Sequence, residues 1–365
     1  MKQFFVNTGN RYANQSIHQI VPSLTCGDGI GNYVRAIRRH LLRQGADSLI
    51  YVLSADKKIS NESVFFDPKK LHDSDTILYH YSIRSELTPH IIKHTGKKFL
   101  IYHNITPAVF FQEYQPDFAE ELHQGRAELK DIASFIHHSW GVSRYNGEEL
   151  KRSGFHEPQV VPIVIEPAKW NSSPDRELMA ELQTGKKNIL FTGRMAPHKR
   201  QDHLVEAFAW LQTMIPKTHL YLVGDYTGTD PYYRHVCNTI EKFYLQEHVT
   251  ITGKVSDKEL QAYFKNSHLY WSMSEHEGFG IPLIEAMWFD LPVFAYKCSA
   301  IAETLGSAAF MFADKSSMPG LAATAKRLVE DPALRQTIIQ AQRIRRRDFL
   351  PEPVFQQLDR VLSCS

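Results

Sequence analysis

Apolar residues recur with two different periods along the chain, and the two patterns alternate. Short apolar runs, typical of buried strands, are separated by longer segments with apolar positions three and four residues apart. In the first half, the strand-like runs lie at residues 4–7, 48–53, 76–80, 98–102, 135–142 and 160–165. In the second half, they lie at residues 188–192, 219–223, 249–252, 268–273, 292–296 and 308–312. Strand–helix alternation of this kind predicts an α/β protein with parallel sheets covered by helices on both faces.

The first half also holds a long polar segment and one well-marked helix. We expect a loop over residues 8–30, because Gly, Asn, Ser and Thr are frequent there, and we interpret it as a substrate-facing flap. A helix is expected over residues 33–44, with Tyr33, Ile37 and Leu41 spaced one turn apart on its core face.

Length and a break in the pattern predict two domains. A chain of 365 residues exceeds the usual size of a single core. Pro, Ser, Asn and Lys interrupt the alternation near the middle of the chain. We therefore expect an N-terminal domain at residues 1–166, a linker at 167–187 and a C-terminal domain at 188–349. Two prolines interrupt the last helical run, which predicts that a terminal helix at about residues 350–365 packs back on the first domain.

Composition narrows the class and the compartment. A hydrophobic content of 43% and a charged content of 22% are typical of a globular protein. The formal net charge of +2 argues against a nucleic-acid partner. Four cysteines without paired or metal-type spacing indicate a reducing compartment. No apolar run approaches the roughly 18 residues of a membrane span, so we expect a cytoplasmic protein, at most peripheral on the inner face of the membrane.

The chemically richest run is Ser-Glu-His-Glu-Gly-Phe-Gly at residues 274–280, between a predicted strand and a predicted helix. Gly278 and Gly280 allow the backbone to approach a ligand closely, and the proline that follows suits a first helical turn. A strand, a glycine turn and a helix N-terminus together form an anion site. Two carboxylates, Glu277 and Glu285, flank this turn. Beside a phosphate site, they suit sugar hydroxyls better than they suit phosphate.

Two cations follow the first strand of the second domain. Arg194 and Lys199 come after the predicted strand and before a predicted helix. One forked donor and one point charge suit a diphosphate. Taken alone, the pair is equally typical of a solvated basic loop. Together with the glycine turn in the same sheet, it predicts a diphosphate site.

These motifs resemble the retaining glycosyltransferases of family 4. The resemblance is carried by Gly-Arg-x4-Lys at residues 193–199 and Glu-x7-Glu at 277–285. Within that family, the chain is similar in general to bacterial polysaccharide mannosyltransferases. It is close over residues 188–312 and looser in the first domain, where Tyr-His-Asn-Ile-Thr-Pro at 102–107 contributes. The resemblance implies the GT-B fold, with two Rossmann-like domains facing each other across a cleft. It also implies a nucleotide-sugar donor held mainly by the second domain and an acceptor held mainly by the first.

The resemblance further implies a role for each motif residue. Arg194 and Lys199 would neutralise the donor diphosphate, whose charge grows as the glycosidic bond breaks. Glu285 would accept hydrogen bonds from the ribose, and Glu277 from the transferred sugar. His103, at a strand end of the first domain, would face the sugar ring near the anomeric carbon. Further donor contacts are expected at Gly29, Gly31, Val255, Gly278, Phe279, Gly280 and Ile281.

Three implications concern the reaction and its surroundings. The resemblance implies retention of configuration, with no bound metal and no other cofactor. No strong nucleophile stands out, so front-face substitution fits better than double displacement.

The helix after the glycine loop carries four arginines. They are ordinarily interpreted as a solvated face, and the alternative is contact with anionic lipid headgroups. They are Arg35, Arg38, Arg39 and Arg43.

We therefore predict a retaining, metal-independent hexosyltransferase acting in surface polysaccharide or lipopolysaccharide synthesis. GDP-mannose is the favoured donor, and a saccharide or lipid-linked saccharide is the expected acceptor. A UDP-hexose donor remains open. Among other classes, a nucleotide-sugar epimerase is disfavoured by the complete motif set. An NAD-dependent oxidoreductase is disfavoured because the glycine loop does not follow its strand at dinucleotide spacing.

Overall fold

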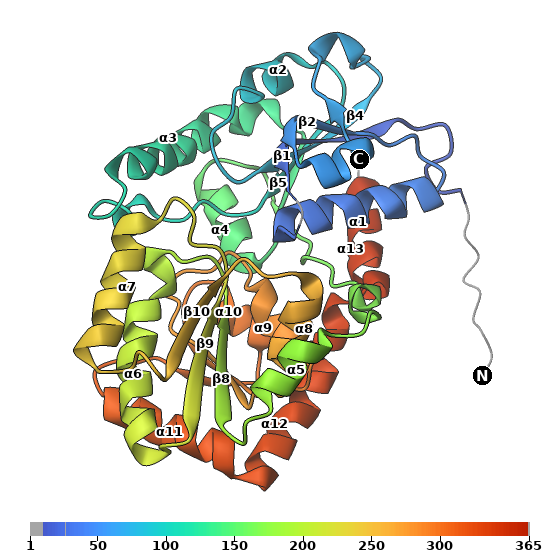
Figure 1. Ribbon diagram of the computed structural model, residues 1–365. Coiled ribbons are helices and arrows are strands. Elements are labelled where there is room, and N and C mark those ends of the chain that lie inside the picture. Colours follow the sequence, from blue (N-terminus) through green and yellow to red (C-terminus); the bar gives the residue numbers. More distant parts are fainter. Residues whose placement is uncertain (1–9, 26, 364–365) are drawn as a thin grey trace, which may run out of the picture. The chain divides into compact units, whose positions relative to one another are not determined.

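The chain divides into two compact units in the computed structural model, which describes residues 10–25 and 27–363 (Figure 1). The first unit comprises Met1–Ile105, Glu121–Glu166 and Pro351–Ser365. The second comprises Thr106–Glu120 and Pro167–Leu350. A short segment from the first half of the chain thus belongs to the second unit, which the sequence did not predict. The strand predicted at residues 4–7 lies outside the described residues.

The first unit is built on a seven-stranded parallel sheet in the order β3-β2-β1-β4-β5-β6-β7. Its strands are β1 (Ile17–Leu24), β2 (Ile50–Ala55), β3 (Val64–Phe65), β4 (Thr76–Tyr81), β5 (Lys98–Tyr102), β6 (His138–Gly141) and β7 (Gln159–Val160). Its α-helices are α1 (Gly29–Arg43), α2 (Thr88–Lys93), most of α3 (Pro116–Ile132), α4 (Arg144–Arg152) and α13 (Pro351–Ser363).

The second unit is built on a six-stranded parallel sheet in the order β10-β9-β8-β11-β12-β13. Its strands are β8 (Lys187–Thr192), β9 (Thr218–Val223), β10 (Val249–Gly253), β11 (Leu269–Ser272), β12 (Val293–Tyr296) and β13 (Phe310–Phe312). Its complete α-helices are α5 (Arg176–Leu182), α6 (Gln201–Met214), α7 (Asp230–Lys242), α8 (Asp257–Asn266), α9 (Ile281–Trp288), α10 (Ile301–Leu305), α11 (Met318–Glu330) and α12 (Pro332–Arg345).

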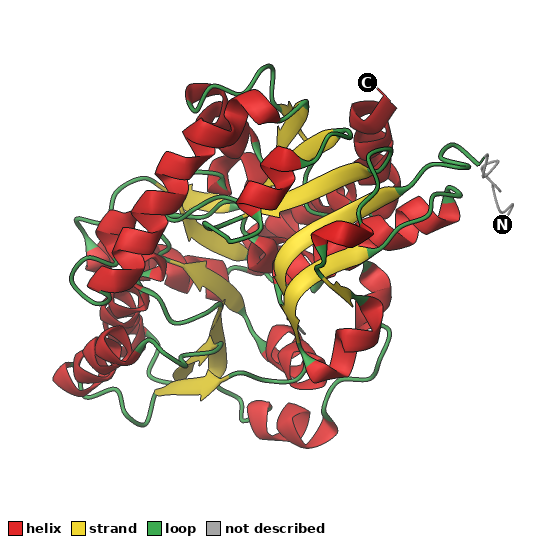
Figure 2. Ribbon diagram, turned by 90° about the horizontal axis from the view of Figure 1, so that it is seen from above, coloured by secondary structure: helices red, strands yellow, loops and turns green. Residues whose placement is uncertain are grey.

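Helices cover both faces of the second sheet. Figure 1 shows α6, α7 and α11 on one side of β8 to β10 and α5, α8 and α9 on the other. Figure 2 shows the strands in yellow with helices around them. Apolar side chains of α6, α7 and α11 pack on those of β8, β9 and β11 in one buried cluster. Both sheets have the strand order of a doubly wound dinucleotide-binding fold, so two Rossmann-like units are confirmed.

The long loop predicted at residues 8–30 is wrong. It contains β1, a central strand with β2 and β4 on its two sides. His18, Gln19 and Pro22 disguised it, because such residues are uncommon in a buried strand. The proline is tolerated because the pairing with β4 runs only from Ile17 to Ile20, so Pro22 lies beyond it. The substrate-facing flap is therefore replaced by part of the core.

Helix α1 begins at Gly29, four residues before the predicted start. Asp28 is its N-cap, and its Oδ2 accepts a hydrogen bond from Gly31 N at 3.0 Å. Gly29 and Gly31, predicted as loop residues, therefore form the first helical turn. A Cβ on Gly31 would lie 2.9 Å from Thr25 O, so close backbone packing explains this glycine. Because the Gly31 N–H already has an acceptor, this group is a poor candidate for a phosphate contact.

Helix α13 packs beside α1 in the first unit. Tyr12 Oη and His40 Nε2 lie 2.8 and 2.7 Å from Asp359 Oδ1, and the His40 ring stacks on Phe355 at 4.3 Å. The terminal helix therefore completes the first unit although it follows the second in sequence. The segment expected as a linker at residues 167–187 contains α5 and belongs to the second unit.

Candidate active site

The two motifs of the second half meet at the point where the strand order reverses. β8 and β11 are neighbours, and ligands of doubly wound sheets bind outside the carboxyl ends of such a pair. Arg194 and Lys199 follow β8, and residues 274–280 follow β11. Glu275 N donates to His198 O at 2.7 Å, which joins the two loops directly. The fold thus brings together residues that are far apart in the sequence.

Lys199 and Glu277 form a two-pronged ion pair. The Lys199 Nζ lies 2.6 Å from Glu277 Oε1 and 2.7 Å from Oε2, and the two side chains are 17% and 14% exposed. The Glu277 backbone N–H donates to Ser299 Oγ at 2.8 Å, which anchors the turn. The cation and the carboxylate that the sequence assigned to different parts of a ligand are therefore bound to each other. Each restrains the other at the sheet edge.

Of the two glycines in this turn, Gly280 is the one with a positive φ. Gly280 has φ +92°, in the left-handed region, and it caps the start of α9. A Cβ at this position would lie 2.9 Å from Leu283 Cδ1. The Phe279 side chain is buried, and its carbonyl accepts from Thr304 Oγ1 at 2.6 Å. Phe279 therefore holds the turn, and only its backbone N–H remains as a group that it could offer to a ligand.

Glu285 is buried on α9, and its partner was not predicted. Lys169 Nζ lies 3.5 Å from Glu285 Oε1 and 3.4 Å from Asp257 Oδ1, and it also sits 4.3 Å from the centre of the Trp170 ring. Burial raises the pKa of the Glu285 carboxyl, and Lys169 partly opposes that rise. Lys169 lies in the expected linker, where no periodic pattern marked it.

Arg194 is exposed, and its Nη2 donates to Thr227 O at 3.2 Å. The strand end that carries it is packed tightly: a Cβ on Gly224 would lie 2.1 Å from Gly193 O. Val255 is half-buried in the loop between β10 and α8, and its contact with the donor stays a prediction. Arg194 is more exposed than Lys199, whose side chain is 17% exposed.

His103 lies at the carboxyl end of β5 in the first unit and is only 9% exposed. Its Nε2 lies 2.8 Å from His80 Nδ1, and burial lowers the pKa of His103 to about 3. The next residue, Asn104, has φ +79° and donates to Glu149 Oε2 at 3.1 Å. Arg126 holds Glu149 at 2.6 Å. These contacts were not predicted, because the residues that make them are scattered in the sequence.

The second unit matches a known family. Residues 176–345 match the family model described as "Glycosyl transferases group 1". This segment is therefore similar to the group 1 glycosyltransferases.

Individual relatives extend the comparison. An "Uncharacterized 41.2 kDa protein in cps region" of Klebsiella pneumoniae is 31% identical over 34% of this chain and 32% of its own length. An "O-antigen chain mannosyltransferase B" of Escherichia coli is 23% identical over 40% of this chain and 38% of its own length. Both matches span less than half of the relative. HepE of Anabaena, solved with UDP and glucose, superposes with a TM-score of 0.76 at 16% identity, covering 96% of this chain and 100% of its own. The GT-B fold predicted from the sequence is confirmed.

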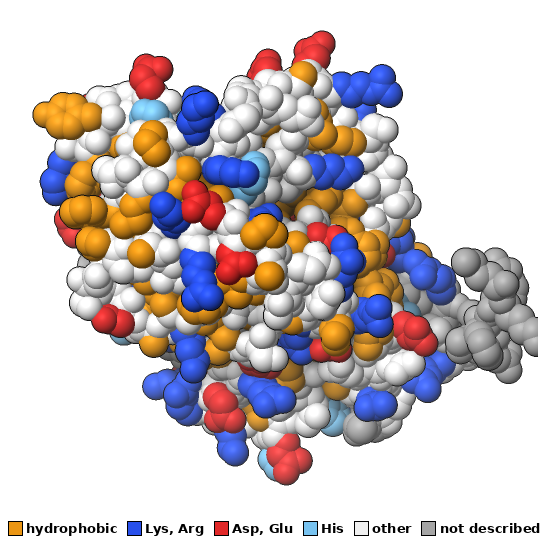
Figure 3. All heavy atoms as spheres, turned by 90° about the horizontal axis from the view of Figure 1, so that it is seen from below, with side chains coloured by type: hydrophobic (Ala, Val, Ile, Leu, Met, Phe, Trp, Pro, Cys, Tyr) orange, Lys and Arg blue, Asp and Glu red, His pale blue; other side chains and the backbone are white. Residues whose placement is uncertain are grey.

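The four arginines of α1 are mostly engaged within the first unit. Arg35 pairs with Glu62 at 2.7 and 2.8 Å, Arg38 donates to Ser48 O at 2.9 Å, and Arg39 pairs with Glu166. These partners favour a structural role over a lipid-binding one. On the face drawn in Figure 3, basic and acidic side chains are interspersed.

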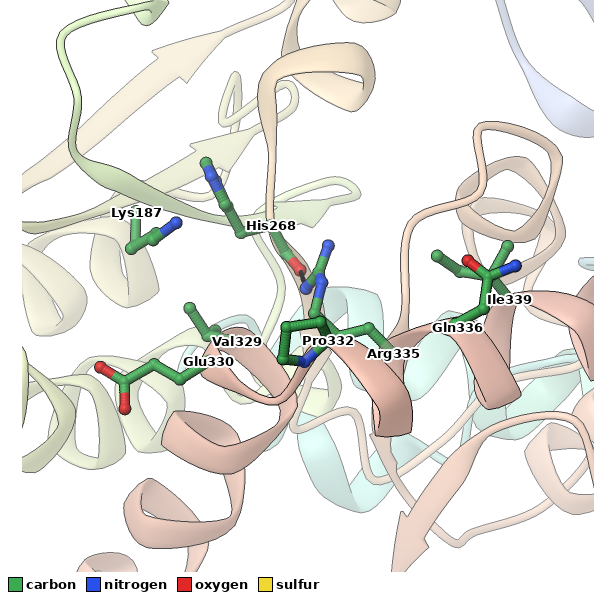
Figure 4. A pocket seen from close by; sticks show the side chains of 8 residues that line it. All are labelled: Lys187, His268, Val329, Glu330, Pro332, Arg335, Gln336 and Ile339. Carbon is green, nitrogen blue, oxygen red and sulfur yellow. Dashed lines mark hydrogen bonds between the residues drawn. The ribbon is translucent and has the colours of Figure 1, made fainter.

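A hollow in the second unit lies at the edge of the sheet opposite the motifs. It is about 400 Å³, and Figure 4 shows Lys187, His268 and Arg335 around it. Lys187 begins β8 and His268 precedes β11, so this is the amino end of the strands. Arg335 donates to the carbonyls of His268 and Leu328, which gives it a structural role.

Among the described residues, no helix is long and apolar enough to span a membrane, and no group of three His, Cys, Asp or Glu could hold a metal ion.

Proposed function

We propose that the protein is a retaining glycosyltransferase that moves a hexose from a nucleotide-sugar to a saccharide or lipid-linked saccharide. The observation that carries this proposal is the meeting of the Lys199–Glu277 pair and the Gly280 turn at the β8–β11 edge. A cation, a left-handed glycine and a helix N-terminus at one sheet edge suit a diphosphate. The buried carboxylate of Glu285 on the same helix suits a ribose.

The two cations would act together on the diphosphate of the donor. Lys199 and Arg194 would share the negative charge that grows on the leaving diphosphate. Each charge-assisted hydrogen bond of this kind contributes about 1.5–3 kcal/mol, or roughly ten- to hundredfold in rate if it forms only in the transition state. Because Lys199 is already held by Glu277, it is positioned before the donor arrives. Positioning in advance lowers the cost of reorganisation during the reaction.

The chemical step that fits these residues is a front-face substitution. The acceptor oxygen attacks the anomeric carbon on the side from which the diphosphate leaves, and a phosphate oxygen takes the acceptor proton. No side chain is then required as a covalent nucleophile. The anomeric configuration of the product tests this step, because an inverted product would contradict it. The proposal also holds that no metal is required, so transfer should persist in excess EDTA.

GDP-mannose is the donor that we propose, supported by the likeness to the O-antigen mannosyltransferase. A UDP-hexose is the second candidate, since HepE was solved with UDP and glucose. Donor hydrolysis should be compared for GDP-mannose, UDP-glucose, UDP-galactose and UDP-N-acetylglucosamine. Fastest release of GDP from GDP-mannose supports the first donor. Preference for any UDP-sugar overturns that choice and leaves the transferase proposal in place.

We further propose that the acceptor belongs to surface polysaccharide synthesis on the cytoplasmic side of the membrane. The Klebsiella relative described as lying in a cps region supports this setting. If the first unit touches anionic lipid, Arg43 is the α1 arginine best placed to do so, because the other three have partners inside the unit. Arg43→Glu should then reduce co-sedimentation with anionic vesicles and not with neutral ones. Equal sedimentation of the variant and the wild type would remove the membrane contact from the proposal.

A further inference from the structure

Three polar side chains form a buried hydrogen-bonded row across the first sheet. Gln19 lies on β1, His80 on the adjacent β4, and His103 directly after β5. His80 Nε2 is 3.0 Å from Gln19 Oε1, and His80 Nδ1 is 2.8 Å from His103 Nε2. Gln19 and His80 are 0% and 1% exposed. Polar groups buried to this degree are costly unless they are hydrogen-bonded, and these bonds meet that need for Gln19 and His80.

The direction of every hydrogen bond in this row follows from its first member. Gln19 Nε2 donates to the backbone oxygen of Val34 at 3.0 Å, which fixes the orientation of the amide. Gln19 Oε1 therefore accepts from His80, so the His80 proton is on Nε2. A neutral His80 then has a lone pair on Nδ1, and His103 must donate to it from Nε2. The remaining ring nitrogen of His103, Nδ1, is left as an acceptor.

Both rings are suited to the neutral form. Burial lowers the pKa of His80 well below 6.5 and that of His103 to about 3. The ring of Tyr33 stands edge-on to both, with centroids at 6.4 and 5.9 Å. His103 Nδ1 is buried and has no hydrogen-bond partner among the described residues. A neutral ring nitrogen without a proton can accept a hydrogen bond from a ligand.

We infer that Gln19 and His80 are positioning residues that hold His103 in the Nε2–H tautomer, so that its Nδ1 accepts a hydrogen bond from a hydroxyl of the bound sugar. This inference rests on the proposed function, in which His103 faces the transferred sugar. It deepens that function by stating the chemistry at this point of contact: the donor must carry a hydroxyl there. A site that requires a hydroxyl discriminates strongly against an analogue that lacks it.

The tautomer can be measured directly on the full-length protein. Nitrogen-15 spectra of labelled histidine side chains distinguish protonated from unprotonated ring nitrogens, and His103→Asn identifies the His103 signals by their loss. The expected result is a protonated Nε2 and an unprotonated Nδ1. A protonated Nδ1 in the wild type overturns the inference. This result does not depend on whether any nucleotide-sugar is turned over.

Two substitutions separate positioning from folding. Gln19→Met removes both hydrogen bonds and frees His80 to reverse, so His103 should show a mixture of tautomers and turnover should fall about tenfold. Gln19→Glu retains an acceptor for His80 and should keep the wild-type tautomer and recover most of the turnover. His18→Phe removes another buried histidine of β1 and serves as the control, with the His103 tautomer unchanged.

Donor analogues complete the test. Replacing the sugar hydroxyls one at a time by hydrogen should yield one analogue on which wild type and Gln19→Met act equally slowly. An unchanged His103 tautomer in Gln19→Met would show that the row is only structural. Absence of turnover with every nucleotide-sugar would instead contradict the proposed function, while the tautomer of the free protein would still stand.

Discussion

The Lys199–Glu277 pair offers a quantitative test of how the site is held together. Its closest N–O distance is 2.6 Å, and both side chains are largely removed from solvent. With an effective dielectric constant of about 20, the Coulomb attraction at that distance is roughly 6 kcal/mol. Desolvation of two ions offsets several kcal/mol of this, which leaves a net coupling of about 1–3 kcal/mol. Each ion remains poorly solvated if its partner is removed.

The perturbation is a double-mutant cycle with Lys199→Met and Glu277→Gln. Each single change should destabilise the second unit by about 2–3 kcal/mol, because it leaves one ion unpaired in a largely buried place. For a domain of this size, about 2–4 °C of melting temperature corresponds to 1 kcal/mol, so each single variant should melt about 4–12 °C lower. The double variant should lose less than the sum of the two.

Thermal unfolding by circular dichroism measures these shifts, and Lys326–Glu330 supplies the matched control. That pair belongs to the same unit, is 3.8 Å apart and has side chains that are 41% and 46% exposed. Its coupling should not exceed about 0.5 kcal/mol. If the Lys199–Glu277 coupling is as small as that of the control, the pair does not organise the site, and the reasoning from its geometry is refuted.

Three further outcomes follow from the same structure. Gly224→Ala should destabilise the second unit by several degrees more than Gly185→Ala, because only the first Cβ meets backbone, 2.1 Å from an oxygen, whereas both glycines have positive φ. Calorimetric titration with the free nucleotide should show a larger loss of affinity in Glu285→Ala than in Glu277→Ala, whose effect on the nucleotide acts only through the position of Lys199; equal losses would mean that the two ends of the donor are misassigned. In the unfolded chain the residue at position 103 is protonated below about pH 6.5, whereas in the folded protein burial lowers the pKa of His103 to about 3. Between these two pH values the free energy of unfolding should therefore fall by about 1.4 kcal/mol for each unit of decreasing pH. His103→Phe should flatten the fall in melting temperature over that range, and an unchanged slope would contradict the burial argument.

The periodic parts of the fold could be predicted from the sequence. β5 has the predicted bounds, and the predicted strands of the second half all coincide with observed strands, because runs of buried apolar residues mark parallel strands clearly. β1 was missed because its His, Gln and Pro residues break that pattern. Gln19 is one of these residues, and it is also the first member of the polar row with His80 and His103. The residue that made the strand hard to predict is thus the one on which the inference about His103 depends.

The chemistry of the site could be predicted only in part. Arg194, Lys199 and the glycine turn were found because their spacing recurs as a motif. Lys169 was not, since its contact with Glu285 depends on how the segment before α5 folds over the second sheet. Nor could the sequence show that Lys199 and Glu277 are bound to each other, because pairing across two loops is a property of the tertiary structure.

Release of nucleoside diphosphate tests the central claim most directly. The full-length protein, Lys199→Met and the control Lys326→Met should be incubated with each of the four nucleotide-sugars. The account predicts release of GDP from GDP-mannose by the wild type and the control, reduced about ten- to hundredfold in Lys199→Met. No release from any of the four donors, or equal release by Lys199→Met, would contradict it.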